Sequence, residues 1–342
     1  MGAAGLADAA TTAPATTSPA SSPSSTTADL LRRTSLLTWA SLGALAALLG
    51  LLPWLATGTR LPLQNLWREA TAPADMPRVL LPFSQYALTQ LLGLLVTAFA
   101  LAGLLARLLA RTTRLRWPRR SMLALAAGTL GVHLLAAAQT TLTVAAGLST
   151  RPASALYLAA LLAALAVALA AGLLVLRLLL AASRAAVVIG VSLSAVLGAS
   201  WLAALVVPLT IAGGAAASGQ PRQPGQPGPA ALQAINALEH WLPAVLVGAV
   251  IAWSGVRTLG RILAAASGLA LLWILPAALT AVTSAAGFRL LLPHPGELAE
   301  YGAQVFSAVL LTPGLVLPPL LLALMVAAGG TAARHLHTRR SS

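Results

Sequence analysis

The chain lacks cysteine and lysine, and it has few charged residues of any kind. Without cysteine there are no disulfides, no zinc–thiolate sites and no cysteine nucleophile. Only 8% of the 342 residues are charged, whereas a soluble domain carries about 25%. So few charged side chains could not cover the surface of a soluble protein. With 58% apolar residues and a mean hydropathy of +0.86, the chain is predicted to be an integral membrane protein.

Acidic residues are also few. The chain has 7 acidic residues and 21 arginines, so its net charge is +14. In a soluble protein this balance would suggest nucleic-acid binding. Here the arginines lie between hydrophobic runs, so their positions indicate which loops face the cytoplasm. We therefore expect no nucleic-acid partner.

Eight hydrophobic runs predict an all-α membrane fold with about eight transmembrane helices. The runs cover residues 35–57, 86–110, 122–148, 155–181, 186–212, 241–256, 262–287 and 303–328. A span needs about 20 apolar residues, and the sixth run alone is shorter. The stretch just before it, Leu232–Trp241, is predicted to be a short helix on the outer surface.

The two ends of the chain differ from the runs between them. Residues 1–29 are mostly Ala, Thr, Ser and Pro. They have too little apolar area to offset the entropy of ordering, so we predict a disordered cytoplasmic tail. Residues 331–342 form a second, basic cytoplasmic tail.

The distribution of arginine decides the orientation. With eight spans and both termini inside, 15 of the 21 arginines fall in cytoplasmic segments, and five of the seven acids fall outside. The positive-inside rule therefore favours eight crossings with both termini in the cytoplasm. The Ala-, Leu- and Arg-rich composition suggests a bacterial plasma membrane.

The third and seventh runs resemble each other. Residues 122–147 and 262–287 align without gaps and are identical at 12 of 26 positions, including Gly128/Gly268 and Thr140/Thr280. This predicts two four-helix halves, 30–185 and 186–330, in a parallel repeat. The alternative is a similarity caused by composition alone.

Polar residues inside the runs are candidates for lining a cavity. Such side chains avoid lipid and face other helices. The alternative for each is a hydrogen bond between helices, and for His133 a neutral imidazole bonded to a neighbour. A Pro-Gly pair in the eighth run should break that helix, as in transporter binding sites, or leave a kink satisfied by its neighbours. The candidates are Gln90, Thr97, His133, Gln139, Thr140, Gln304, Thr312, Pro313 and Gly314.

These patterns favour a permease for a small molecule or lipid. No Asp or Glu lies within any run, so we expect transport without an intramembrane carboxylate. The alternative is a scaffold or regulator of envelope assembly. No catalytic set, cofactor motif or metal site is readable, so we expect no enzyme.

Two kinds of partner are expected besides the bilayer. A protein partner would bind through loop 58–85 or loop 111–121. Anionic lipid is expected at one arginine-rich cytoplasmic loop. That loop contains Arg111, Arg114, Arg116, Arg119 and Arg120.

Overall fold

The chain folds almost entirely into helices. The computed structural model describes residues 25–64, 66–113, 119–206, 229–288 and 294–340. Within these ranges the only β-structure is two isolated bridges. The helices are α1 (Ser25–Ala56), η1 (Gln85–Ala87), α2 (Leu88–Thr113), α3 (Arg119–Gly147), α4 (Pro152–Leu180), α5 (Arg184–Leu197), α7 (Pro229–Ser254), α8 (Leu259–Gly287), α9 (Pro295–Leu310) and α10 (Pro313–Arg340).

Seven described helices are long and apolar enough to cross a membrane. An eighth candidate is the pair formed by α5 and the helical segment Ala199–Val206, which meet at 43°. Gly198 separates the two segments and ends α5. The predicted all-α membrane fold with about eight spans is therefore confirmed.

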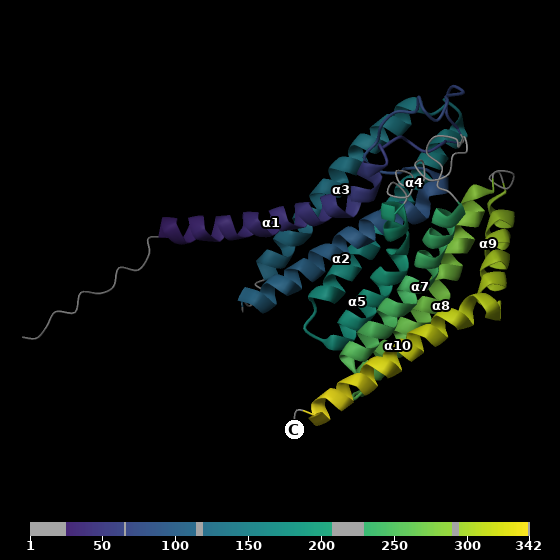
Figure 1. Cartoon of the computed structure of the whole chain (residues 1–342). Coiled ribbons are helices and arrows are strands. Elements are labelled where there is room, and N and C mark those ends of the chain that lie inside the picture. The colour runs from purple at the N-terminus through teal and green to yellow at the C-terminus, as the bar shows by residue number, and fades with distance from the viewer. Residues whose placement is uncertain (1–24, 65, 114–118, 207–228, 289–293, 341–342) are drawn as a thin grey trace, which may run out of the picture.

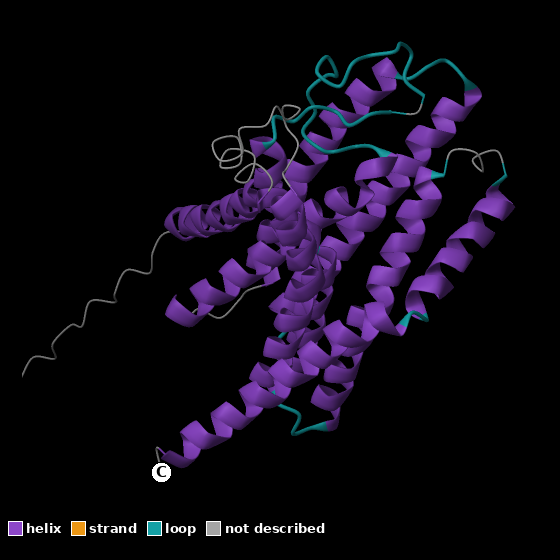
Figure 2. Cartoon of the chain, turned by 45° about the vertical axis from the view of Figure 1, so that its right-hand side comes forward, coloured by secondary structure: helices purple, strands orange, loops and turns teal. Residues whose placement is uncertain are grey.

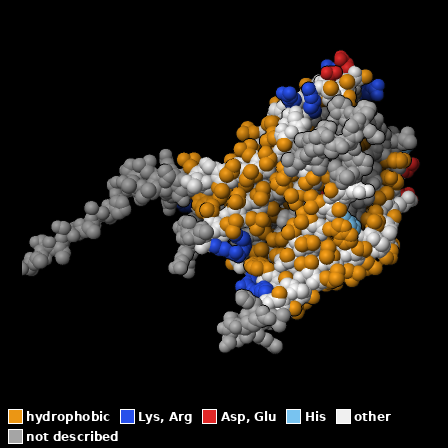
Figure 3. All heavy atoms as spheres, in the orientation of Figure 1, with side chains coloured by type: hydrophobic (Ala, Val, Ile, Leu, Met, Phe, Trp, Pro, Cys, Tyr) orange, Lys and Arg blue, Asp and Glu red, His pale blue; other side chains and the backbone are white. Residues whose placement is uncertain are grey.

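The third span shows why such helices need partners in a bilayer. On one face of α3 the side chains of Thr129, His133 and Thr140 are fully buried. On other faces Leu135 and Leu142 are 73% and 72% exposed. Small and polar side chains thus face neighbouring helices while leucines face outward, as expected where lipid offers no hydrogen bonds. Figure 3 shows the resulting apolar surface over much of one face of the molecule.

The helices form two groups, α1–α4 and α5–α10 (Figure 1). In the first group α1 packs mainly on α3 and α2 on α4, and in the second α5 packs on α8 and α7 on α10. Gly128 lies at the α1–α3 contact, where a Cβ would overlap the carbonyl of Ala40. Gly268 lies at the α5–α8 contact, where a Cβ would be 2.7 Å from Ser192 Oγ. The order of pairing is the same in both groups, and the internal repeat itself stays a prediction.

Both described ends of the chain lie at one end of the bundle. Figure 1 shows α1 beginning and α10 ending on the left and lower side, away from the loops at the upper right. We call the end of the bundle where α1 begins and α10 ends the tail end, and the opposite end the loop end. Both predicted tails are shorter in the structure than in the sequence-based prediction. α1 begins at Ser25, so the last five residues of predicted tail 1–29 are helical, and 1–24 lie outside the described residues. α10 continues to Arg340, so most of the predicted basic tail 331–342 is helical as well.

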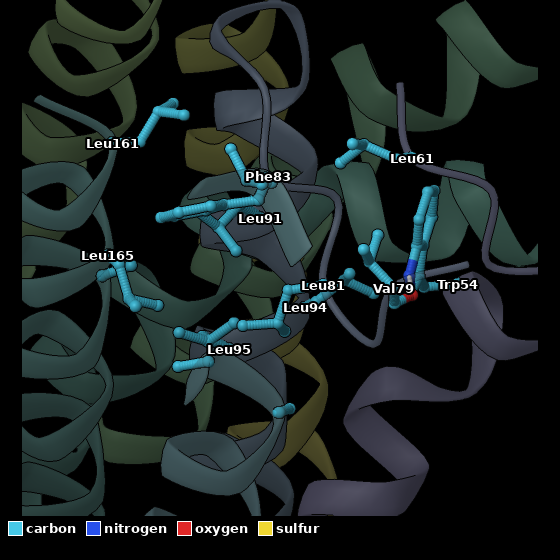
Figure 4. Packing of buried hydrophobic residues seen from close by; sticks show 14 of the residues in the cluster. Trp54, Leu61, Val79, Leu81, Phe83, Leu91, Leu94, Leu95, Leu161 and Leu165 are labelled. Carbon is cyan, nitrogen blue, oxygen red and sulfur yellow. Dashed lines mark hydrogen bonds between the residues drawn. The ribbon is translucent and has the colours of Figure 1, made fainter. Parts of the chain in front are cut away.

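Residues 57–64 and 66–84, the capping loop, cover the loop end of the first group (Figure 2). Leu61, Val79, Leu81 and Phe83 are almost fully buried in one cluster with leucines of α2 and α4 (Figure 4). The indole of Trp54 at the end of α1 donates a 2.9 Å hydrogen bond to Val79 O. The loop is therefore part of the hydrophobic core.

Polar side chains of α3 and α4 clamp this loop in place. Leu80 N donates to Gln139 Oε1 at 3.0 Å, and Leu81 N donates to Thr140 Oγ1 at 3.1 Å. The hydroxyl of Tyr157 donates to Gln64 Oε1 at 2.7 Å. Gln139 and Thr140 thus replace the partners that these backbone amides lack outside a helix or sheet.

Replacing Thr140 by valine should loosen the capping loop. The change leaves the buried Leu81 N–H without its acceptor, which costs about 1–3 kcal/mol. Thr283→Val is the control, because Thr283 Oγ1 bonds only to carbonyls of its own helix. We expect faster proteolysis of the capping loop and a lower melting temperature for Thr140→Val alone. Equal behaviour of the two variants would contradict the clamp.

Candidate functional site

Two of the predicted cavity residues, Gln139 and Thr140, serve the capping loop as just described. A third, His133, is buried in the first group. Its ring stacks on Phe99 with centroids 5.5 Å apart, and its Nδ1 lies 2.8 Å from Thr129 O. Among the described residues its Nε2 has no hydrogen-bond partner. The surroundings are those of a packed core imidazole.

The remaining candidates lie on three other helices. Gln90 and Thr97 are half-buried on α2, and Thr97 Oγ1 would be 2.7 Å from a Cβ on Gly198. Gln304 is exposed on α9 and donates to Glu300 Oε1 at 3.4 Å. Thr312, Pro313 and Gly314 lie at the junction of α9 and α10. The structure does not gather the nine candidates into one place, and none of them lines the cavity described below.

The predicted break in the eighth run is present. α9 ends at Leu310 and α10 begins at Pro313, so the run 303–328 is divided between two helices. α9 packs along α8, and the indole of Trp273, the central residue of α8, donates to Leu310 O at 3.2 Å. Thr312 N donates to Val309 O at 3.3 Å. The break therefore lies beside the middle of a candidate span, and neighbouring groups satisfy its carbonyls.

The sixth span corrects two sequence-based predictions. The predicted surface helix and the 16-residue run are one helix, α7, whose candidate span is Leu232–Ser254, 23 residues. The apolar face that was assigned to a surface helix continues into the span. Glu239 therefore lies within a candidate span, contrary to the expectation that none contains a carboxylate. It is the one Asp or Glu in the described candidate spans.

A cavity of about 220 Å³ opens beside Glu239. α7, α8 and the α9–α10 break surround it. Its polar lining comes from Glu239, His240, Trp273 and Thr280, and most of the other lining residues are apolar. His240 also lies edge-on to Trp241, with ring centroids 4.6 Å apart. The cavity thus combines one acidic group with an apolar wall.

Prolines leave some backbone carbonyls of the residues that line this cavity without a helical hydrogen-bond donor. A proline has no N–H, so the carbonyl four residues earlier loses its helical donor. Pro243 removes the donor for Glu239 O, and Pro276 removes the donor for Leu272 O. A third pair is Pro319 with Leu315. Glu239, Leu272 and Leu315, the three residues that lose a donor, line the same cavity.

The break was predictable from the sequence, whereas this site was not. Mean hydropathy falls at the polar pair Glu239–His240, so the carboxylate was assigned to a short helix on the outer surface rather than to a span. The spacing of Leu232, Ile235 and Leu238 was the available signal that the helix continues. Each proline was visible in the sequence, but only folding brings helices α7, α8 and α10 around one cavity.

The described arginines of the predicted lipid-binding loop lie on the surface. Arg111, Arg119 and Arg120 are exposed at the tail end, while Arg114 and Arg116 lie outside the described residues. Arg119 also lines an apolar groove of about 590 Å³ between α3 and α4. Searches of protein-family models, curated proteins and solved structures find no match to the chain.

Proposed function

We propose that this multi-pass membrane protein is a permease in which a small monovalent cation, H⁺ or Na⁺, binds at Glu239. The cation is either the substrate or the ion coupled to it. One observation carries the proposal: the one carboxylate in the described candidate spans lies on a cavity beside a broken helix.

The chemistry of the cavity favours a cation. A carboxylate inside a membrane is costly unless it is paired or reaches water, so it marks a functional position by default. Carbonyls that lack helical donors supply further oxygen ligands, and unwound helices in transporters bind Na⁺ or H⁺ in this way. The carbonyls of Glu239, Leu272 and Leu315, which lose their helical donors to prolines, fit that pattern.

The position of the cavity fits an opening toward the outer side. Glu239 lies seven residues from Leu232, the loop-end limit of its candidate span, which corresponds to about 10 Å. The tail end carries most of the arginines, so we assign it to the cytoplasm. The carboxylate would then be reached from outside, and the apolar wall would leave room for a small molecule beside the cation.

A docking role for the capping loop is the second candidate function. Leu63 and Leu80 are 52% and 40% exposed on a loop whose neighbouring residues Leu61, Val79 and Leu81 are buried. Exposed apolar residues on an ordered loop are typical of a protein contact. This role predicts a partner that binds the capping loop and no cation flux.

Cysteine labelling tests the cavity directly, because the chain has no native cysteine. In outside-out vesicles, Thr280→Cys should react with a membrane-impermeant thiol reagent, since Thr280 lines the cavity. Sodium should slow the reaction if it binds there. Val282→Cys is the control, because Val282 is 58% exposed on the same helix but does not line the cavity. Equal labelling of both positions would contradict a water-filled cavity.

A further inference from the structure

A second cavity, unrelated to the proposed cation site, lies at the tail end of the second group. Its volume is about 220 Å³. Four arginines line it, each from a different segment: Arg184 opens α5, Arg257 precedes α8, Arg261 lies in the first turn of α8, and Arg334 lies on α10. Segments far apart in the sequence thus bring four positive charges to one hollow.

The last turn of α7 holds three of these side chains in place. Arg261 Nη1 donates to Ser254 O at 3.2 Å, and Arg334 Nη1 donates to Ala252 O at 2.8 Å. The guanidinium of Arg184 lies 5.6 Å from the ring centroid of Trp253, a cation–π distance. Cations at the C-terminus of a helix are favourable because they complement its dipole. A guanidinium has five N–H donors, and the bond of Arg261 Nη1 to Ser254 O uses one of them.

Among the described residues, no acidic side chain lines this cavity. Beyond Arg184 the sequence has only Glu239, Glu297 and Glu300. Glu239 lies in the loop-end half of α7, and the other two lie in the first turns of α9. Like charges that share one hollow repel, and the repulsion grows as water is excluded. The cavity therefore favours an anion.

The backbone adds positive potential in the same place. α5 and α8 both begin at this end, so the positive ends of their dipoles lie beside the cavity. The cap of α8, Thr258, makes no side-chain hydrogen bond to the helix. Gly255, with φ of 67°, makes the tight turn between α7 and α8, a conformation that favours glycine.

We infer that the four-arginine cavity binds a phosphate group. Arginine forks match phosphate oxygens in pairs, and several forks around one hollow suit an ion with more than two acceptor oxygens. Basic pockets between transmembrane helices on the cytoplasmic side hold anionic lipid headgroups. In Figure 3 arginine patches border the apolar surface at its lower left edge. The phosphate belongs either to a lipid headgroup or to a soluble ion.

Ligand binding to the purified, delipidated full chain tests this inference. The probes are dioctanoyl phosphatidylglycerol, dioctanoyl phosphatidylcholine and inorganic phosphate, with dissociation constants measured by thermophoresis. We expect Arg257→Gln to weaken phosphatidylglycerol binding about tenfold, as for loss of a charged hydrogen bond. Arg257 is exposed, so its replacement should leave the fold intact. Arg184→Gln serves as a second variant.

The control is Arg120→Gln, which removes an exposed tail-end arginine outside this cavity. It should change the affinity less than twofold. If inorganic phosphate also binds and competes, the source is a soluble anion, and if only the lipid binds, the source is a headgroup. The inference is overturned if neither phosphatidylglycerol nor inorganic phosphate binds, or if Arg257→Gln and Arg120→Gln behave alike.

Discussion

Leucine in place of Gly128 should prevent the first helix group from assembling. The α1 and α3 backbones meet at this point, and even a Cβ on Gly128 would overlap the carbonyl of Ala40. A Cβ on Gly43 of α1 would overlap Leu125 O in the same way. Both close contacts are between backbones, so rotating a side chain relieves neither. We expect a loss of about 3 kcal/mol of stability, the upper end of the usual range for overpacking, because neither backbone can move aside alone.

Gly131 offers a matched control on the same helix, because a Cβ there meets nothing within 4 Å. Gly131→Leu should keep the melting temperature and elution profile of the native protein in mild detergent. Gly128→Leu should aggregate or elute early. The close α1–α3 packing would be refuted if both variants eluted and melted alike.

The second large effect is expected at Glu239. Glu239→Gln keeps the shape of the side chain and removes its charge, so it should lower cation flux into proteoliposomes at least about tenfold. The flux is measured with ²²Na⁺ and with a pH-sensitive dye. The same change should raise the melting temperature, because it removes a charge that is costly inside a span. A loss of flux together with a gain in stability is a pattern that misfolding cannot produce.

Glu300→Gln is the control, because Glu300 is exposed on α9 and does not line the cavity. Its flux should stay within twofold of the native protein. Unchanged flux in Glu239→Gln would remove the basis of the proposed permease. That result would leave the phosphate site untouched, since its binding assay does not depend on transport.

The general architecture was predictable because lipid imposes simple rules. Length and apolarity alone located the third span, predicted at 122–148 and observed at Arg119–Gly147. The break between α9 and α10 followed from Thr312-Pro313-Gly314, since proline removes a donor wherever it lies. These features depend only on neighbours in the sequence.

The site was not predictable in the same way. Glu239 was assigned to a surface helix outside the membrane because hydropathy averages over a window, whereas a helix that lines a cavity tolerates one charge. Gln139 and Thr140 looked like cavity residues because their partners, the amides of Leu80 and Leu81, are distant in sequence. Packing between helices decides which polar groups come into contact, and the sequence of one helix does not contain that information.

The clamp on the capping loop also bears on how transport would proceed. It ties α1, α3 and α4 together at one membrane surface, while the cation site lies wholly on α7–α10. Alternating access would then move the second group against a static first group. The short connection at 181–183, between α4 and α5, would be the pivot. Crosslinks within the first group should leave the cycle running, and crosslinks between the groups should arrest it.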